Sequence, residues 1–363
     1  MSSQQTPGGD ATGRQSAHSL VEQSLVEIWN TMLERTDIAT TDNLFESGAD
    51  SLLALVAIEQ INQRLGWTLN MGDLISYPTI RDLTANKALH QAANTERMIV
   101  RMSNRGSRTP IVFIHPGLGL VAGYARLVRL LGADRGCYGV QSPRLMQSNG
   151  PHLPDSIEAM AALYTDLIED EFGEDEFHLV GACAGGAIAL EIAKLAAERD
   201  LGMRTLVLID SYLWNATADE MTEQAILTSF REDVLRTAVS DDTVPPEGLT
   251  DADPAAVFRD VSMSLFGAEV GHADGAGTQF VQRLYDSYRA TYTALGNYSP
   301  SPGAAPLDAL LLLSQDNDTL DGWRGLIKGE LTTGAVDDDR FGLLYITKAA
   351  ELAEHIGAYL GEG

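Results

Sequence analysis

Cys183 stands in a motif whose residue types and spacing suit nucleophilic chemistry. Residues 181–186 read Gly-Ala-Cys-Ala-Gly-Gly, between an apolar stretch and a segment with helical periodicity. This is the nucleophile elbow G-x-S-x-G with cysteine in the serine position. Glycines flank such a nucleophile because a sharp strand-to-helix turn leaves no room for side chains. A helix N-terminus also lowers the pKa of a thiol, so we expect a reactive Cys183. The alternative is a small buried cysteine packed at the junction.

Ser51 is a second residue placed where chemistry is possible. The run Gly48-Ala49-Asp50-Ser51-Leu52 puts a serine at the start of a predicted helix, after an acidic residue and an apolar loop. Serine is a common N-cap, and this role alone explains its position.

The elements that must position Cys183 alternate between strand and helix. Apolar strands are predicted at residues 110–115, 137–141, 176–183, 205–211 and 308–314. Helices are predicted at residues 155–172, directly after the elbow, and at 349–360. This alternation predicts a mostly parallel sheet covered by helices on both faces. Residues 214–300 show helical periodicity without a strong strand, which predicts a helical insertion that acts as a lid.

The N-terminal part of the chain has a different organisation. Residues 1–18 are rich in Ser, Gln, Gly and Thr and are expected to be disordered. Helical periodicity over residues 19–92, with Thr79 as the N-cap of the last helix, predicts a small four-helix bundle. Residues 93–109 have no consistent period and are predicted to be a linker to the second domain, residues 110–363.

Composition excludes several classes of protein. With 25 Lys and Arg against 51 Asp and Glu, the net charge is −26, which argues against nucleic acid and anionic membranes as partners. The two cysteines imply no disulfide framework, and no apolar run is long enough to cross a membrane. The beginning of the chain has no secretory h-region, so a cytoplasmic location is expected. No metal site is predicted.

Residues 110–363 resemble the type I thioesterases that terminate nonribosomal peptide synthetases. The resemblance rests on the segments IHPGLG, GACAGG and LVLIDSY and on Gly322-Trp323. It implies an α/β-hydrolase fold in which Asp210 is the acid that orients a catalytic base. A cap or turn is the alternative role for Asp210. The family's oxyanion hole corresponds to the backbone N–H groups of Gly117, Leu118 and Ala184.

The first domain resembles the carrier proteins of nonribosomal peptide and polyketide synthases. The segment LFESGADSLLALVAIEQIN, residues 44–62, carries this resemblance. It implies a 4'-phosphopantetheine attached covalently to Ser51, with Asp50 and Leu52 beside it. A helix N-terminus favours such a phosphate. The implied partners are a phosphopantetheinyl transferase, the linear peptidyl thioester and upstream synthetase modules.

The second domain departs from its family at the catalytic histidine. The family has a histidine before a phenylalanine after the last strand, and Arg340 stands there in Asp338-Asp339-Arg340-Phe341. His272, in a glycine-rich part of the predicted lid, is the best substitute base. A solvated loop histidine is the alternative.

A cysteine nucleophile and an arginine in place of the histidine are chemically compatible. A thiol ionises more easily than a hydroxyl, and a nearby Arg340 would stabilise the thiolate. Weak activation of water disfavours hydrolysis and favours attack by an internal nitrogen. This combination resembles the cysteine thioesterases of the monobactam (sulfazecin-type) synthetases, which form a β-lactam.

Other readings of the second domain stay open. Hydrolysis and macrolactam formation are the alternatives within the same class of enzyme. A non-catalytic domain that holds or docks the acyl group is an alternative from another class. A cysteine introduced in place of serine to trap an acyl-enzyme would also give this sequence.

Overall fold

The computed structural model divides the chain into two compact units, residues 1–95 and 96–363. The described residues are 20–33, 35–49, 51–65, 67, 69, 71–86, 98–103, 106–131, 135–145, 153–213, 217, 219–238, 253–270, 276–303, 305–315, 317–336 and 348–361. The predicted disordered segment, residues 1–18, lies outside them.

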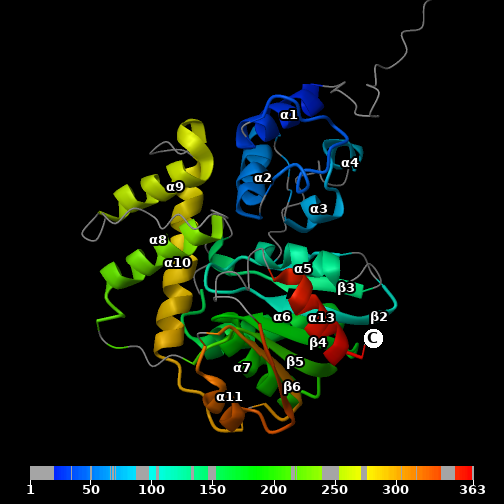
Figure 1. Ribbon diagram of the computed structural model, residues 1–363, viewed down its shortest axis with the longest axis vertical. Coiled ribbons are helices and arrows are strands. Elements are labelled where there is room, and N and C mark those ends of the chain that lie inside the picture. Colours follow the sequence, from blue (N-terminus) through cyan, green and yellow to red (C-terminus); the bar gives the residue numbers. More distant parts are fainter. Residues whose placement is uncertain are drawn as a thin grey trace, which may run out of the picture. The chain divides into compact units, whose positions relative to one another are not determined.

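The first unit is helical in all its described secondary structure (Figure 1). Its helices are α1 (Leu20–Met32), α2 (Ser51–Leu65), α3 (Met71–Ser76) and α4 (Ile80–Ala85). Their apolar faces form the core because residues at helical spacing share one side of each helix. Leu25, Ile28, Trp29 and Met32 of α1 are buried, whereas Leu20 at its start is 82% exposed. Thr79 caps α4, as predicted, by accepting a hydrogen bond from the Asp82 N–H.

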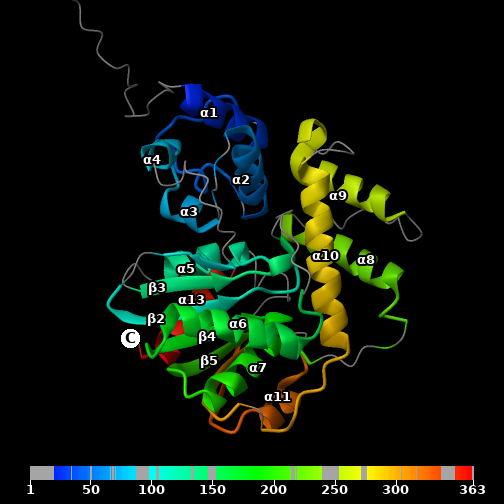
Figure 2. The ribbon, with the colours of Figure 1, turned by 180° about the vertical axis from the view of Figure 1, so that it is seen from behind.

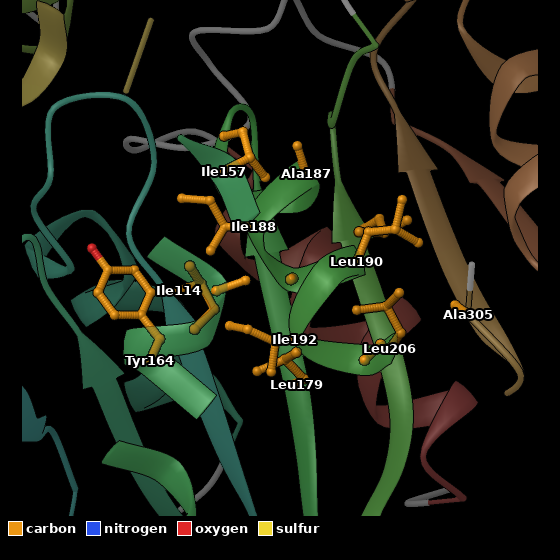
Figure 3. Packing of buried hydrophobic residues seen from close by; sticks show 14 of the residues in the cluster. Ile114, Ile157, Tyr164, Leu179, Ala187, Ile188, Leu190, Ile192, Leu206 and Ala305 are labelled. Carbon is orange, nitrogen blue, oxygen red and sulfur yellow. The ribbon is translucent and has the colours of Figure 1, made fainter. Parts of the chain in front are cut away.

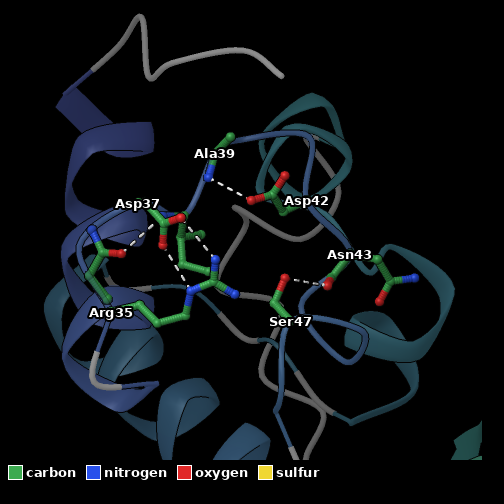
Figure 4. A network of polar contacts seen from close by, with 8 residues as sticks. Arg35, Asp37, Ala39, Asp42, Asn43 and Ser47 are labelled. Atoms are coloured by element: carbon green, nitrogen blue, oxygen red, sulfur yellow. Dashed lines mark hydrogen bonds and ion pairs between the residues drawn. The ribbon is translucent and has the colours of Figure 1, made fainter. Parts of the chain in front are cut away.

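The loop between α1 and α2 is held by its own polar groups, which fixes where α2 begins. Arg35 pairs with Asp37, and the Ala39 N–H donates to the Asp42 carboxylate over 3.0 Å (Figure 4). Asn43 accepts the Ser47 hydroxyl on its carbonyl at 2.8 Å. Gly48 then turns the chain toward α2 with a φ of 115°, a conformation that favours glycine.

The second unit is built on a sheet of seven strands among the described residues. The strand order is β1-β3-β2-β4-β5-β6-β7, and each pair is parallel except β1 with β3. The strands are β1 (Ile99–Arg101), β2 (Arg108–Ile114), β3 (Arg135–Val140), β4 (Phe177–Ala182), β5 (Met203–Ile209), β6 (Ala309–Leu313) and β7 (Leu331–Ala335). The carboxyl ends of the parallel strands meet at one edge, which is where such sheets place their sites.

Helices cover both faces of this sheet (Figures 1 and 2). α6 (Ile157–Phe172) and α7 (Gly185–Glu198) pack together on one face, and α5 (Ala125–Leu130) and α13 (Ala349–Tyr359) pack together on the other. Fully buried side chains of α7, including Ile188 and Ile192, interdigitate with those of Leu179 on β4 and Leu206 on β5 (Figure 3). The elbow is therefore mounted between β4, which is buried along its whole length, and α7, most of whose residues are buried.

Three helices lie between β5 and β6, where the sequence predicts a lid. They are α8 (Glu223–Ala238), α9 (Pro254–Val270) and α10 (Ala276–Gly296). They contact one another, and α10 also packs against α6 and the short turn η3 (Pro143–Leu145). The long α10 stands beside the sheet in both views (Figures 1 and 2).

The structure extends the sheet beyond the predicted strands. Ile99–Arg101, inside the segment predicted to be a linker, forms β1 and pairs with β3. The predicted α/β-hydrolase sheet also gains β7 at its other edge. Both edge strands are short, and neither carries the continuous apolar run that identifies the central strands.

Candidate active site

Cys183 occupies the sharp turn between β4 and α7. Its backbone has a φ of 52°, in the left-handed region that non-glycine residues rarely adopt. Its N–H donates to the Ile209 carbonyl over 3.0 Å, so the residue is still tied to β5. Such a conformation costs on the order of 1–3 kcal/mol and persists where the surrounding packing enforces it. The thiol is partly exposed, in contrast to the fully buried Cys137.

The glycines of the elbow are required by close approach. An ideal Cβ on Gly181 would lie 2.5 Å from the Gly185 carbonyl oxygen, and one on Gly185 would lie 2.5 Å from that of His115. A Cβ on Gly186 would overlap the Ser211 hydroxyl. The elbow is therefore pressed against the ends of both β2 and β5, as the motif predicts.

Asp210 lies at the end of β5 with its carboxylate fixed from the neighbouring strand β6. Its Oδ1 accepts three hydrogen bonds, from the Ser314 N–H at 3.0 Å, the Ser314 hydroxyl at 2.7 Å and the Asn317 amide at 2.9 Å. None of the described residues donates to its Oδ2. Asp210 is buried, and its φ of 43° is also left-handed. The side chain is thus held rigidly with one oxygen available for a further donor.

Trp323 secures the turn that follows Asp210. Its indole N–H donates to the Ser211 carbonyl over 2.9 Å, and the whole side chain is buried. The Thr319 hydroxyl donates to the same carbonyl over 3.2 Å. The Gly322-Trp323 pair of the sequence therefore acts as a support for the acid, behind the site.

The loop after β2 brings backbone N–H groups beside the elbow. The Gly119 N–H donates to the Pro116 carbonyl over 2.9 Å, which folds residues 116–119 into a tight turn. Within the described parts of the chain, neither the Leu118 N–H nor the Ala184 N–H donates a hydrogen bond. A Cβ on Gly185 would lie 2.5 Å from the His115 carbonyl oxygen. The segments that carry the Leu118 and Ala184 N–H groups therefore lie against each other. Preorganised donors of this kind stabilise an oxyanion in acyl transfer.

Two tyrosines connect Cys183 with the helices of the insertion. The Cys183 thiol donates to the Tyr212 hydroxyl over 3.6 Å. Tyr288 on α10 donates its hydroxyl to Asp233 on α8 over 2.8 Å, and its ring lies 3.6 Å from the position of a Cβ on Gly117. Burial, Asp233 and Tyr212 together raise the pKa of Tyr288 above its usual value. α10 thus reaches the predicted oxyanion loop, and Tyr212 reaches the thiol.

Comparison with known proteins identifies the second unit. Residues 109–360 match the thioesterase domain family, and residues 23–86 match the phosphopantetheine attachment site. The chain belongs to the thioesterase domain family. The second match implies that a serine carries a covalent phosphopantetheine.

Relatives of the thioesterase chain include much longer synthetases. It is 32% identical over 194 residues to malpibaldin synthetase of Mortierella alpina, which covers 53% of this chain and 3% of that protein. It is 27% identical over 191 residues to a dimodular nonribosomal peptide synthase of Bacillus subtilis (strain 168), covering 53% of this chain and 8% of that one. The chain therefore spans a small fraction of the length of these relatives.

Solved structures share its folds. A four-domain nonribosomal peptide synthetase, holo-AB3403, matches with a TM-score of 0.65 and 23% identity over 95% of this chain and 26% of the other. The Vlm2 thioesterase domain matches with a TM-score of 0.54 and 19% identity over 72% of this chain and 98% of the other. At this identity the likeness shows the fold, which is the expected α/β-hydrolase fold.

The described histidines of the thioesterase unit are not hydrogen-bonded to Cys183 or Asp210. His115 is fully buried, with Nδ1 bound to the Pro116 carbonyl and Nε2 to the Tyr164 hydroxyl, and burial lowers its pKa to about 4. His178 bonds Thr205 at the start of β4, and burial lowers its pKa to about 4 as well. These two histidines are structural and neutral at pH 7.

Several predicted site residues lie outside the described residues. These are His272, Arg340 and Asp50, and the side chains of Ser51 and Leu52 are likewise not described. The backbone places Ser51 at the first residue of α2.

Sequence reasoning missed the residues that surround the elbow. Tyr212, Tyr288, Ser314 and Asn317 were not predicted to take part. A usable signal existed for Ser314 and Asn317, because polar residues that follow a buried strand reach the same edge of the sheet as Asp210.

The structure adds two observations on metals and membranes. The described residues contain no group of three or more His, Cys, Asp or Glu side chains placed to hold a metal ion. Among the same residues, no helix is long and apolar enough to cross a membrane.

Proposed function

We propose that this chain receives a peptidyl group on phosphopantetheine at Ser51 and releases it through Cys183. The observation that supports this most is the left-handed backbone of Cys183 at the head of α7, with the fixed carboxylate of Asp210 at the end of the adjacent strand. This arrangement suits a nucleophile that must be exposed at the head of a helix. The helix start at Ser51 suits a phosphodiester.

The first step transfers the acyl group between two sulfur atoms. The Cys183 thiolate attacks the thioester carbonyl of the arm, and the N–H groups of Leu118 and Ala184 stabilise the oxyanion. The N–H group of Gly117 is the third proposed donor to this oxyanion. The carbon–sulfur bond to the arm breaks, and the arm leaves as a thiol after taking up a proton. Cys183 then carries the peptidyl group as a thioester.

The second step releases the product by internal attack. A nitrogen of the peptidyl group attacks the Cys183 thioester, the base takes the proton of that nitrogen, an amide bond forms and the Cys183 thiolate leaves. We propose that this closes a β-lactam, as in monobactam biosynthesis, because the thioester favours nitrogen as acceptor. Asp210 orients a base, which we assign to His272, and Arg340 stabilises the thiolate by its charge. Upstream synthetase modules and a phosphopantetheinyl transferase are the proposed partners.

An acyl-loading experiment tests the first step. A pantetheine thioester of a linear peptide is expected to give an intact-mass adduct on the wild-type chain and on Cys137→Ala, but not on Cys183→Ala. Loading of Cys183→Ala to the wild-type extent would contradict the assignment. Failure of the wild type to acquire any adduct or product would favour the non-catalytic docking module.

The product distinguishes the kinds of release. A β-lactam from the same substrate supports the proposed ring closure, whereas free acid alone would replace it with hydrolysis. A larger lactam would replace it with macrolactam formation.

The attachment site has its own test. The transferase and coenzyme A are expected to add phosphopantetheine to the wild type and to Ser24→Ala on α1, but not to Ser51→Ala. Modification of Ser51→Ala would show that another serine carries the arm.

A further inference from the structure

We infer that Tyr212 is a positioning residue that stabilises the Cys183 thiolate by a hydrogen bond from its phenol. The Tyr212 hydroxyl lies 3.6 Å from the Cys183 sulfur, within reach of a hydrogen bond to sulfur. In the thiol form the sulfur donates, and on ionisation the direction reverses, so that the phenol donates to the thiolate. This inference rests on the proposed role of Cys183 and names a group that serves it.

The position of Tyr212 is fixed by the turn after β5. Asp210 is held by Ser314 and Asn317, and the Ser211 carbonyl is held by Trp323. Tyr212 is the next residue. Its side chain is therefore attached to a rigid backbone just after β5, the strand next to β4. A donor held in place this way costs little reorganisation when the sulfur becomes charged.

A residue of the insertion, Tyr288, also lies close to Tyr212. Tyr288 lies near enough to Tyr212 for the two hydroxyls to affect each other's ionisation, and Tyr288 is anchored to Asp233. Tyr288 donates its own proton to Asp233 over 2.8 Å. The insertion thus places one of its hydroxyl groups near that of Tyr212.

The charges around Cys183 determine how strongly this hydrogen bond affects the ionisation of the thiol. Asp210 on β5 and Asp233 on α8 are acidic and oppose a thiolate, while the N-terminus of α7 favours it. His115 is neutral, since burial lowers its pKa to about 4, and so offers no positive charge. The phenol of Tyr212, 3.6 Å from the sulfur, and the start of α7 both favour the anion.

The pH dependence of Cys183 alkylation by iodoacetamide tests the inference. Peptide mapping by mass separates Cys183 from Cys137, which is buried and whose pKa is raised to about 11. Tyr212→Phe is expected to raise the midpoint of Cys183 alkylation by about one pH unit. 3-Fluorotyrosine at position 212, a stronger donor of the same shape, is expected to lower that midpoint.

The control is Tyr298→Phe. It removes a buried hydroxyl that donates a hydrogen bond of 2.7 Å to Glu191 and makes none to Cys183. It is expected to leave the midpoint unchanged. Equal midpoints for the wild type, Tyr212→Phe and the fluorotyrosine protein would overturn the inference. That result is distinguishable from failure of the proposed function, because the alkylation assay needs no peptidyl substrate and the acyl-loading assay needs no pH titration.

Discussion

At the scale of single residues, the site combines unfavourable backbone conformations with hydrogen bonds that hold them in place. Cys183 and Asp210 both adopt left-handed backbone conformations at the ends of adjacent strands. Each is held by hydrogen bonds from its neighbours, so the unfavourable conformation is maintained by packing rather than by the residue itself. The side chains that could react are therefore fixed before a substrate arrives.

Asn317 should matter for acyl transfer although it lies behind Asp210. Asn317→Ala removes one of three donors to Oδ1, and a hydrogen bond to a charged group contributes about 1.5–3 kcal/mol. We expect acyl transfer from a pantetheine thioester to Cys183 to slow by about tenfold or more, measured by intact mass over time. The control is Asn297→Ala, whose amide makes an exposed bond to the Thr293 carbonyl. An unchanged rate in Asn317→Ala would remove Asp210 from the transfer step.

At the scale of elements, the central strands and the elbow were predictable and the edges were not. The stretches around Phe113, Leu179 and Val207 are continuous apolar runs, because strands buried on both faces leave no polar alternation. β1 has three residues, and β7 reads Leu-Thr-Thr-Gly-Ala with partly exposed positions. Neither has a period that distinguishes a strand from a loop.

The site itself was predictable only where one motif contains it. The elbow and Asp210 follow from local patterns in the chain. The contacts of Tyr212, Tyr288 and Asn317 arise because the topology brings β5, β6 and α10 together, and no local spacing encodes that meeting. Sequence therefore located the proposed nucleophile but not the residues that surround it.

The packing of α7 against the turn after β5 can be tested with a single methyl group. Gly186→Ala places a Cβ where the Ser211 side chain lies, and overpacking of this kind costs about 1–3 kcal/mol. We expect the free energy of unfolding in urea to fall by that amount and Cys183 alkylation to change. Gly325→Ala on α11 (Leu320–Leu326) is the control, since nothing lies within 4 Å of its Cβ. Equal free energies of unfolding for the two variants would mean that the elbow accommodates a Cβ at position 186 without overpacking.

At the scale of the whole molecule, the second unit combines a rigid sheet with an insertion that reaches the site. The sheet is closed on both faces by helices, and the insertion between β5 and β6 adds α8, α9 and α10. Asp233 and Tyr288 of that insertion contact each other next to the predicted oxyanion loop. Changes in these helices are therefore transmitted to the site by direct contact.

Acid should destabilise this unit through its buried histidines. The pKa of His115 and that of His178 are each lowered from 6.5 to about 4 by burial, so the folded state resists protonation that the unfolded state accepts. Their contribution is fully present above pH 6.5 and is lost as the pH falls toward 4. Between pH 7 and pH 5 we expect each to cost about 2 kcal/mol of the free energy of unfolding.

Urea titrations at the two pH values measure this loss. His178→Gln should show a smaller difference between pH 7 and pH 5 than the wild type, because one of the two histidines no longer titrates. An equal difference in both proteins would mean that His178 is protonated as easily in the folded state as in the unfolded state.

The antiparallel β1 has a mechanical consequence. It is the first strand of the second unit, and its three pairs with β3 lie at the outer edge of the sheet. A pull on the chain before β1 would reach this strand before it reached β2. β1 can peel away pair by pair while β2, paired on both sides, stays in place. Loss of the three β1 pairs would leave the pairing of β2 with β4, the strand that leads to Cys183, unchanged.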